Sequence, residues 1–536
     1  MKVIIRQIEV SLDYREEDVL SAIAKKLRCN EKDIKSFNIF RRSLDARPRR
    51  SAPVYVLQAE ANISDKVKSN ALRNKDVEMA SQNFQPDFKI PHLTRPHDPP
   101  VIIGAGPAGL MAAYHLAAMG LKPVLIERGC KTEDRKPLVE KFWRNGKFDP
   151  ECNVLYGEGG AGLFSDGKLT ARSKDKARIR LFFETLVECG APKDILIDAE
   201  PHLGSDKLLE IVPNLREKIL GKGGEIIYNT RLEHILFDGN QINSIIAGGR
   251  KFRTNRLILA TGHSARDIYQ LLAEANVKLE AKPFAVGIRL EIPQAQINKA
   301  QYGEFSGHPK LQAASFRLTR RPEGGARACY SFCMCPGGLV ISCASEAGGL
   351  TTNGMSYSAR NGFYGNAAFI VPINPEDFSV FARQNPYSEL AGIKFQQEIE
   401  RAAFKKGGGN FSVPALRLED FLNDRISVDL PGNRSCKMST PADFREILPE
   451  FVIKTLKIAI PKMLAELNGC NPADAIVYAA ETRSSSPIRI VRNELCQSIS
   501  HNEIYPAGEG SGYAGGIVSS AVDGIKAAEM LVESLT

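Results

Sequence analysis

The sequence predicts an α/β fold in which one βαβ domain is interrupted by an inserted mixed α+β domain and preceded by a small α+β domain. Three observations predict this organisation. A strand, a glycine turn, a helix and a second strand follow one another over residues 101–127. A strand, a glycine-rich turn and a helix return over residues 504–535. Between residues 281 and 480 the pattern is rich in strands first and helical later, which indicates a second layered unit.

The composition is that of an ordinary globular protein with several domains. The chain has 536 residues, of which 43% are hydrophobic and 25% charged. Arg6 and Glu9 break the apolar run at the N-terminus, and no stretch approaches the roughly 18 apolar residues of a membrane helix. We therefore expect a cytoplasmic protein without a membrane segment. The 11 cysteines lack the spacing of a disulfide scaffold and are expected to be free thiols, mostly buried.

Residues 1–83 are expected to form the small α+β domain. Residues 1–10 alternate like a strand, and a helical pattern opened by acidic residues follows over Asp13–Leu27. Two more strands, Ile34–Arg42 and Pro53–Ala61, complete a βαββ order. Residues 84–96 are an expected linker, because prolines there deny both helix and ladder hydrogen bonds.

The first 95 residues also carry much of the net charge of +9. The densest positive charge is a cluster of five arginines: Arg41, Arg42, Arg47, Arg49 and Arg50. A solvated loop between two strands explains such a cluster. The alternative is a surface that meets an acidic partner or nucleic acid by neutralising phosphates.

Residues 97–280 are expected to form the first part of the α/β domain. An apolar strand, Val101–Ile103, leads into glycines at 104, 106 and 109, and an alanine-rich helix follows over Leu110–Ala118. A second strand, Pro123–Ile126, ends in Glu127. The later expected elements are a helix at Lys207–Leu220 and strands at Glu225–Phe237, Gln241–Ile246 and Arg256–Ala260.

This strand–turn–helix–strand unit has the form of a dinucleotide fingerprint. Gly104 permits the tight turn, Gly106 lets the backbone approach a pyrophosphate, and Gly109 lets the helix pack closely on the strand. The helix N-terminus offers free N–H groups and the positive end of its dipole to the phosphates. Glu127 can accept both ribose hydroxyls of the adenosine. A carboxylate there repels a 2′-phosphate, which disfavours NADP at this site.

Two further segments distinguish between nucleotides. Arg256–Ala265 (RLILATGHSA) resembles the second nucleotide-contacting motif of glutathione-reductase-like flavoproteins. Ile504–Leu531 resembles their last motif, in which an acidic residue follows Ala-Gly and a helix N-terminus points at the flavin. Glu509 stands where these proteins usually have aspartate, and it can hold a ribityl hydroxyl. Backbone N–H groups near residues 515–517 can approach the flavin N1/O2 edge, which gains negative charge on reduction.

Nearly the whole chain resembles a bacterial group of FAD-dependent dehydrogenases within the glutathione-reductase-type flavoprotein superfamily. The most specific motifs are Tyr156–Arg172, Ser331–Gly338, Thr352–Arg360, Gly407–Asn410 and Thr482–Ile490. The resemblance implies a Rossmann-type FAD-binding domain built from residues 97–280 and 481–536, around a substrate domain at 281–480. It also implies an oxidoreductase that transfers hydride between flavin N5 and a small-molecule substrate. The expected FAD-binding residues are Gly104, Ala105, Gly106, Pro107, Ala108, Gly109, Glu127, Arg128, Gly160, Ser165, Leu232, Thr261, Gly262, Gly508, Glu509, Gly515, Gly516 and Ile517.

The candidate catalytic groups come from the loop after the first βαβ unit and from Arg483. In relatives this loop runs beside the isoalloxazine ring. Ser165, Asp166 and Lys168 are its polar groups that can face the flavin or the substrate. Lys168 is the first choice to stabilise a reduced flavin or a bound anion. The alternative is that Asp166 and Lys168 only pair with each other and fix the loop.

Two cysteines of the substrate domain, Cys333 and Cys335, have CxC spacing on a predicted strand. On a regular strand they share one face and lie about 7 Å apart, which is too far for a relaxed disulfide. Core packing is the first interpretation, and a site thiol or redox chemistry are the others. No complete set of four zinc ligands is found, so no metal is expected.

The candidate substrate residues lie in two polar segments that we expect to be flexible. Arg360 and Arg483 can clamp a carboxylate or phosphate, and Asn353, Ser356 and Ser485 can orient it. Buried arginine pairs that hold the domains together are the alternative. His263 is a candidate proton carrier or, alternatively, a cap of the following helix.

The electron donor and a second class of function stay open. The sequence holds no second glycine fingerprint, so NAD(P)H, if used, enters the substrate cleft directly. The alternative function is a flavin-binding regulatory or RNA-associated protein that uses its basic N-terminal domain. A flavin enzyme that modifies RNA combines both features.

Overall fold

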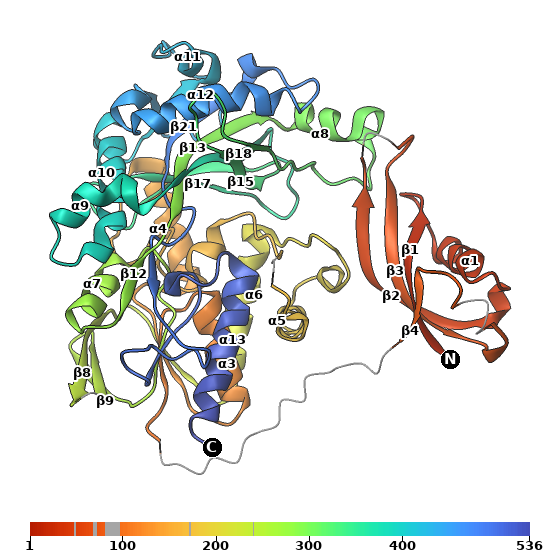
Figure 1. Ribbon diagram of the computed structural model, residues 1–536, viewed down its shortest axis with the longest axis horizontal. Helices are drawn as coiled ribbons and strands as arrows, with labels where there is room; N and C mark the ends of the chain where they lie inside the picture. Colours follow the sequence, from red (N-terminus) through yellow and green to blue (C-terminus); the bar gives the residue numbers. More distant parts are fainter. Residues whose placement is uncertain (48–49, 68–71, 81–96, 171–172, 240) are drawn as a thin grey trace.

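The computed structural model describes the chain except residues 48–49, 68–71, 81–96, 171–172 and 240. The expected linker at 84–96 therefore lies outside the described residues, as do Arg49 and Arg172. Figure 1 shows three units: an N-terminal domain, a domain around a parallel sheet, and a domain around a larger sheet. In the part of the chain that is described, no helix combines the length and apolarity needed to cross a membrane.

The N-terminal domain is an antiparallel sheet covered by one helix. Its strands run in the order β2-β3-β1-β4 and are β1 (Lys2–Val10), β2 (Ile34–Asp45), β3 (Val54–Ile63) and β4 (Val77–Met79). Helix α1 (Glu16–Leu27) buries Val19, Ile23 and Leu27 against the sheet. The α+β fold expected for this segment is confirmed. β4 was not foreseen, because three residues carry too little periodicity.

The arginine cluster of this domain is largely engaged within the chain. Arg42 Nε donates to Asp198 at 2.7 Å, and its backbone N–H donates to the carbonyl of Ile197 at 2.7 Å. Arg47 and Arg50 bind the carboxylate of Asp45, each at 2.7 Å. These arginines dock the domain and fix its β2–β3 loop, which accounts for their positions without a nucleic acid.

The parallel sheet has the order β23-β11-β5-β6-β7 and confirms the Rossmann-type expectation. Its strands are β5 (Val101–Ile103), β6 (Val124–Ile126), β7 (Glu225–Ile227), β11 (Leu257–Leu259) and β23 (Ile504–Pro506). Its helices are α3 (Pro107–Ala118), α4 (Thr132–Asn145), α5 (Lys176–Glu188), α6 (Gly204–Gly221), α7 (Arg266–Glu274) and α13 (Ile517–Glu533). Strand β23 comes from the C-terminal segment, far along the chain from β5, and α3 and α13 lie side by side (Figure 1).

One expected strand of this domain was wrong. The single strand predicted over Glu225–Phe237 is divided, because Asn229 takes a left-handed conformation with φ 52°. The first part, β7, belongs to the parallel sheet. The second part, β8 (Leu232–Asp238), forms an antiparallel meander with β9 (Gln241–Ala247) and β10 (Arg250–Arg253).

The inserted domain is built on a mixed seven-stranded sheet in the order β14-β15-β18-β13-β21-β19-β20. These strands are β13 (Phe284–Pro293), β14 (Thr319–Arg320), β15 (Cys329–Cys335), β18 (Tyr364–Ile373), β19 (Val413–Arg417), β20 (Ser439–Pro441) and β21 (Ile476–Glu481). Two strand pairs flank it, β16 (Leu339–Cys343) with β17 (Thr351–Met355) and β12 (Leu279–Ala281) with β22 (Ile488–Ile490). Its helices are α8 (Gln294–Tyr302), α9 (Ser379–Arg383), α10 (Ala391–Lys406), α11 (Leu418–Leu422) and α12 (Glu450–Leu464).

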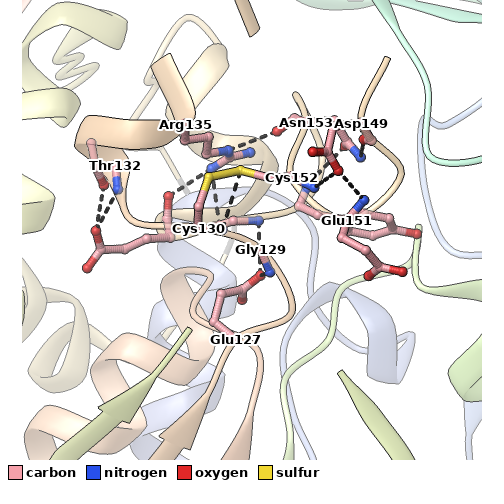
Figure 2. Close-up of a disulfide and its surroundings, with 12 residues drawn as sticks. Glu127, Gly129, Cys130, Thr132, Arg135, Asp149, Glu151, Cys152 and Asn153 are labelled. Carbon is pink, nitrogen blue, oxygen red and sulfur yellow. Dashed lines mark hydrogen bonds between the residues drawn. A yellow bond between two sulfur atoms is a disulfide. The ribbon is translucent and has the colours of Figure 1, made fainter. Parts of the chain in front are cut away.

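The expectation that all cysteines are free thiols was wrong. Cys130 and Cys152 form a disulfide between the loop after β6 and the segment that follows α4. Figure 2 shows it beside Glu127 and Arg135. Spacing could not predict this pair, because 22 residues separate the two cysteines and only the fold brings them together. The other nine are free.

Candidate functional site

A cavity of about 280 Å³ lies where the parallel-sheet domain meets the inserted domain. One wall comes from the ends of β5, β6 and β11 and from the C-terminal strand, turn and helix over residues 504–535, called the C-terminal return below. The other wall comes from β15, β16, β17 and the end of β21. The site therefore lies at the carboxyl ends of parallel strands, where open α/β sheets bind their ligands.

The glycines in the turn after β5 allow its backbone to pack closely on the sheet. Gly104 has φ +100°, and a Cβ there would lie 2.5 Å from the carbonyl oxygen of Ala260. A Cβ on Gly109 would lie 1.8 Å from the carbonyl oxygen of Gly104. The turn is thus possible only with glycines, and it brings the N-terminus of α3 to the cavity, where Gly106, Pro107 and Ala108 line the wall.

Glu127 is held at the end of β6 by backbone donors. Its Oε2 accepts from the N–H of Ala105 at 2.7 Å, and its Oε1 accepts from those of Gly129 and Gly157 at 2.9 and 3.0 Å (Figure 2 shows the Gly129 contact). A carboxylate has about four acceptor positions, so about one stays available to a ribose hydroxyl. The side chain is buried and lines the cavity.

Arg128, the next residue, also lines the cavity. Its guanidinium bonds Glu151 at 2.9 Å and Asp267 at 3.0 Å, and it lies over the ring of Tyr156 at 4.2 Å from the centroid. These contacts fix the side chain with a flat face available beside Glu127.

The C-terminal return supplies the other end of the same wall. Gly508, Glu509, Gly516 and Ile517 all line the cavity, and α13 begins at Ile517. The backbone N–H of Gly516 bonds Glu509, whose pKa is raised to about 7 by burial. His263 Nε2 lies 3.9 Å from Glu509 Oε1.

These residues fit a flavin dinucleotide. Gly104 and Gly106 bring backbone without a Cβ to the cavity wall, the helix end offers backbone donors to phosphates, and Glu127 keeps acceptor capacity for a ribose. The return places a second helix N-terminus on the same wall, which the edge of a flavin can use. Among the described residues, no three His, Cys, Asp or Glu side chains are grouped so as to hold a metal ion.

The expected cofactor residues gather here with three exceptions. Fifteen of them line the cavity: Gly104, Gly106, Pro107, Ala108, Glu127, Arg128, Gly160, Ser165, Leu232, Thr261, Gly262, Gly508, Glu509, Gly516 and Ile517. Ala105, Gly109 and Gly515 are outside the lining: Ala105 and Gly109 are buried beside it, whereas Gly515 is exposed.

Asp166 and Lys168 line the opposite side of the cavity but are not a simple pair. Lys168 Nζ lies 3.8 Å from Asp166 Oδ2 and donates to the carbonyl of Met334. Asp166 is buried, and it accepts from Arg360 Nε at 3.1 Å and from Ser356 Oγ. Lys168 thus keeps a donor for a ligand, whereas Asp166 is a structural anchor.

The expectation that Arg360 clamps a substrate is corrected by its position. It lies outside the cavity lining, and its guanidinium is bound to Asp166, where β17 ends and the loop after η3 (Gly160–Phe164) passes. The segment Thr352–Arg360 was expected to be flexible, yet it begins as buried strand β17. Arg360 therefore holds two domains together, which was the alternative interpretation.

Arg483 lines the cavity, but its guanidinium is already bound to other side chains. It makes a two-point contact with Glu400, at 3.0 and 2.8 Å, and bonds Ser345 Oγ at 2.7 Å. Ser485 lies outside the lining, and its neighbour Ser484 is there instead. Asn353 lines the cavity as expected.

His263 lines the cavity, but neither expected role suits it. Burial, with Arg483 and Arg266 nearby, lowers its pKa to about 3, so the ring is neutral over the physiological range. Helix α7 begins at Arg266 with Ala265 before it and no side-chain cap. His263 is a neutral hydrogen-bonding group on the wall.

Sequence reasoning missed the buried charged pair behind the substrate wall. Arg289 and Glu481 are both buried and meet at 3.0 and 3.1 Å, and Glu481 lines the cavity. The signal was present, because Arg289 stands inside an otherwise apolar strand, Phe284–Pro293, and a buried charge needs a partner. The partner, nearly 200 residues away, could not be named.

The sequence is similar to three protein families along its length. Residues 99–283 match the family described as pyridine nucleotide-disulphide oxidoreductase, and residues 283–484 match the family described as FAD-dependent protein, C-terminal domain-like. Residues 1–62 match a domain of unknown function. A protein of Clostridium beijerinckii, described as uncharacterized, is 41% identical over 540 residues, which are 99% of each chain.

Two solved structures match this chain at low identity and with low TM-scores. L-proline dehydrogenase from P. horikoshii is 13% identical, with a TM-score of 0.31, over 83% of this chain and 95% of that chain. The glycerol-3-phosphate dehydrogenase from Bacillus halodurans, complexed with FAD, is 10% identical, with a TM-score of 0.34, over 82% of this chain and 64% of that chain.

Proposed function

Because this chain belongs to a family of FAD-dependent oxidoreductases, we propose that it transfers a hydride between a small-molecule substrate and N5 of FAD. The observation that carries the proposal is the single cavity with two unlike walls. One wall is glycine turns and helix ends, and the other is side chains of the inserted domain together with Asp166 and Lys168 of the loop after η3. A nucleotide on the first wall would thus share its space with a substrate on the second.

FAD, when bound, supplies a two-electron acceptor that a substrate's hydride can reach. The chain's own residues then have distinct tasks. Glu127 would hold a ribose hydroxyl of the cofactor, and the N-terminus of α3 would offer backbone donors to its pyrophosphate. The N-terminus of α13 lies on the same wall, where its positive end would stabilise negative charge on a reduced flavin.

On the substrate wall, Lys168 is the cation with a donor to spare. Its ammonium has three donors, of which the carbonyl of Met334 takes one. The three arginines near this wall (Arg289, Arg360 and Arg483) are bound to Glu481, Asp166 and Glu400. We therefore expect a substrate with one anionic or carbonyl group at Lys168, oriented by Asn353, and not a polyanion.

The electron donor is proposed to enter the same cavity. The described residues form one dinucleotide-binding sheet, and the inserted domain is an antiparallel-rich sheet of another kind. A pyridine nucleotide that reduces the flavin would therefore occupy the substrate wall and compete with the substrate.

The experiment is an anaerobic reduction screen of the purified yellow protein. NADH, NADPH and fractionated metabolites are added in turn, and the visible absorbance of the oxidised flavin is followed. We expect at least one of them to bleach the flavin, and the bleaching to be slower in Lys168→Met. A flavin that no pool bleaches, although dithionite reduces it, would contradict the catalytic proposal.

The nucleic-acid alternative has no specific observation in its favour. Arg42, Arg47 and Arg50 are bound to acidic side chains of the chain itself. We accordingly propose no second function for the basic N-terminal domain.

A further inference from the structure

Strand β15 carries an irregularity where it borders the cavity. Its pairing with β18 shifts register between Phe332 and Cys335, and Cys333 takes a left-handed backbone with φ 43°. Such a conformation is rare for a residue with a side chain and gathers at functional sites. The prediction that Cys333 and Cys335 share one face of a regular strand was therefore wrong. The bulge turns Cys333 to the cavity, which it lines, and leaves Cys335 buried.

Cys335 lies behind Cys333 as a hydrogen-bonding partner. The Cys335 thiol is within 3.3 Å of the Cys333 carbonyl oxygen, and the two sulfurs also interact. Arg289 Nη1 reaches the same carbonyl at 3.2 Å and the Cys335 sulfur at 4.0 Å. The Arg289 guanidinium and the Cys335 thiol are thus bound to the backbone of the residue whose sulfur faces the cavity.

Strand β17 is shaped around this cluster. A Cβ at Gly354 would lie 2.3 Å from Arg289 Nη1, 2.4 Å from Asn366 Oδ1 and 2.9 Å from the Cys335 sulfur. Only glycine leaves room there. Asn366, paired with Cys335 in the register of β15 and β18, accepts from Arg289 at 2.9 Å and completes the buried set.

We propose that Cys333 is a nucleophilic thiolate site that takes α,β-unsaturated carbonyl compounds from the cavity and binds them as thioethers. The soft sulfur suits the soft β-carbon of such compounds. Lys168 lies on the same cavity and can hold the carbonyl oxygen, and half-exposed Phe332 adds an apolar surface beside the thiol.

The charges that face Cys333 come from several elements and favour its ionised form. The neighbouring Cys335 side chain has the largest effect, and Arg289 of β13 and Lys168 add positive charge. Burial and Glu481 of β21 oppose them, and Glu509 of the return also faces the thiol. The balance lowers the pKa of Cys333, whereas the pKa of Cys335 is raised.

The covalent step needs no oxidant. The Cys333 thiolate gives an electron pair to the β-carbon, the carbon–carbon π bond breaks, and the α-carbon takes a proton from water. The product is a neutral thioether. A thiol of ordinary pKa, near 8.5, is mostly protonated at neutral pH and reacts through its small thiolate fraction.

The test is the pH dependence of alkylation in the holoprotein, with N-ethylmaleimide as the unsaturated carbonyl probe. Peptide mass spectrometry gives the labelling rate of Cys333 and, in the same sample, of Cys29 and Cys470, whose thiol pKa values are raised by burial. We expect the Cys333 rate to rise with a midpoint well below those of Cys29 and Cys470, because the pKa of its thiol is lowered and theirs are raised. At pH 6 it should exceed that of Cys29 by about tenfold, because the larger thiolate fraction outweighs its lower nucleophilicity.

Two variants of the partner sharpen the test. Cys335→Ala removes the donor and should raise the Cys333 midpoint by about one pH unit or more, whereas Cys335→Ser keeps a donor and should hold it near the wild-type value. If Cys335→Ala does not fold, the wild-type profile alone decides. A Cys333 midpoint at or above that of Cys29, or no labelling of Cys333 in the folded holoprotein, overturns the proposal. Because no turnover is measured, the result does not depend on whether the hydride-transfer proposal is right.

Discussion

The two walls of the cavity are built from different parts of the polypeptide. The nucleotide wall is mostly backbone, with glycines at 104, 106, 508 and 516 lining it near the ends of strands and helices. The substrate wall is mostly side chains, and its charged groups are held in buried pairs such as Arg289–Glu481 and Arg483–Glu400. A backbone wall can be recognised in a short stretch of sequence, whereas a wall of paired side chains exists only once the fold has formed.

The two walls should therefore respond differently to substitution: changes in the nucleotide wall should alter the affinity for FAD, and changes in the substrate wall should alter folding stability. A side chain added to the nucleotide wall takes space that a ligand needs. A side chain removed from the substrate wall leaves a buried charge without its partner, which costs folding free energy. Each change below tests this division.

The largest effect is expected for the buried pair. Glu481→Gln leaves the guanidinium of Arg289 buried without a counter-charge, and we expect the free energy of unfolding to fall by about 3–5 kcal/mol. Urea denaturation measures it. The matched control is the exposed helical pair Arg180–Glu184, about half exposed on each side, where Glu184→Gln should cost less than about 1 kcal/mol. Equal losses in the two variants would refute the division.

The second-largest effect is expected at Gly106, which lines the nucleotide wall. Gly106 has φ −76°, and a Cβ there would meet nothing of the protein closer than 3.9 Å, so Gly106→Ala should fold. The methyl group fills space at the head of α3, and we expect the dissociation constant for FAD to rise about 100-fold or more. Flavin fluorescence titration of stripped protein measures it.

Gly221→Ala, at a glycine with open space around it, is the control for this variant. It should leave both FAD affinity and stability unchanged. The contradicting result is that Gly106→Ala lowers the stability of the protein while its folded fraction binds FAD with wild-type affinity. The nucleotide wall would then serve folding stability, as the substrate wall does, and the division between the walls would fail.

A smaller, pH-dependent effect is expected at Glu509. Burial raises its pKa to about 7 from an ordinary value of 4.5, so the folded chain binds an extra proton between these two values. Stability of the flavin-free protein should therefore fall as the pH rises through this window. Glu509→Gln avoids that loss and should be more stable than wild type by about 2 kcal/mol at pH 8, but not near pH 4.5. Thermal unfolding at both pH values measures this, and a pH-independent difference would count against it.

Exposed Glu533→Gln should show no such pH-dependent gain.

The smallest effect is expected at Lys168. Lys168→Met removes one positive charge from the substrate wall, and flavin reduction should slow about tenfold, which corresponds to about 1.4 kcal/mol. Lys168→Arg should recover part of the rate. Anaerobic stopped-flow bleaching with the reductant that works on wild type measures both. An unchanged rate in Lys168→Met would restrict this lysine to holding the carbonyl of Met334.

The sequence was informative where a short segment determines the geometry. The turn at Gly104–Gly109, the carboxylate at Glu127 and the return at Gly508–Ile517 were all predicted, because strand, turn and helix signals are local. The partners of Arg360 and Arg483 were not, since Asp166 and Glu400 lie 194 and 83 residues away. The bulge at Cys333 was also missed, because it depends on how β15 pairs with β18.

The most direct test of the shared cavity is hydrogen–deuterium exchange of the stripped protein before and after FAD is added. We predict slower exchange at three places: residues 104–109, residues 508–517, and residues 351–355 of β17 on the substrate wall. Protection of the first two segments with β17 unchanged would contradict the claim that cofactor and substrate meet in one cavity.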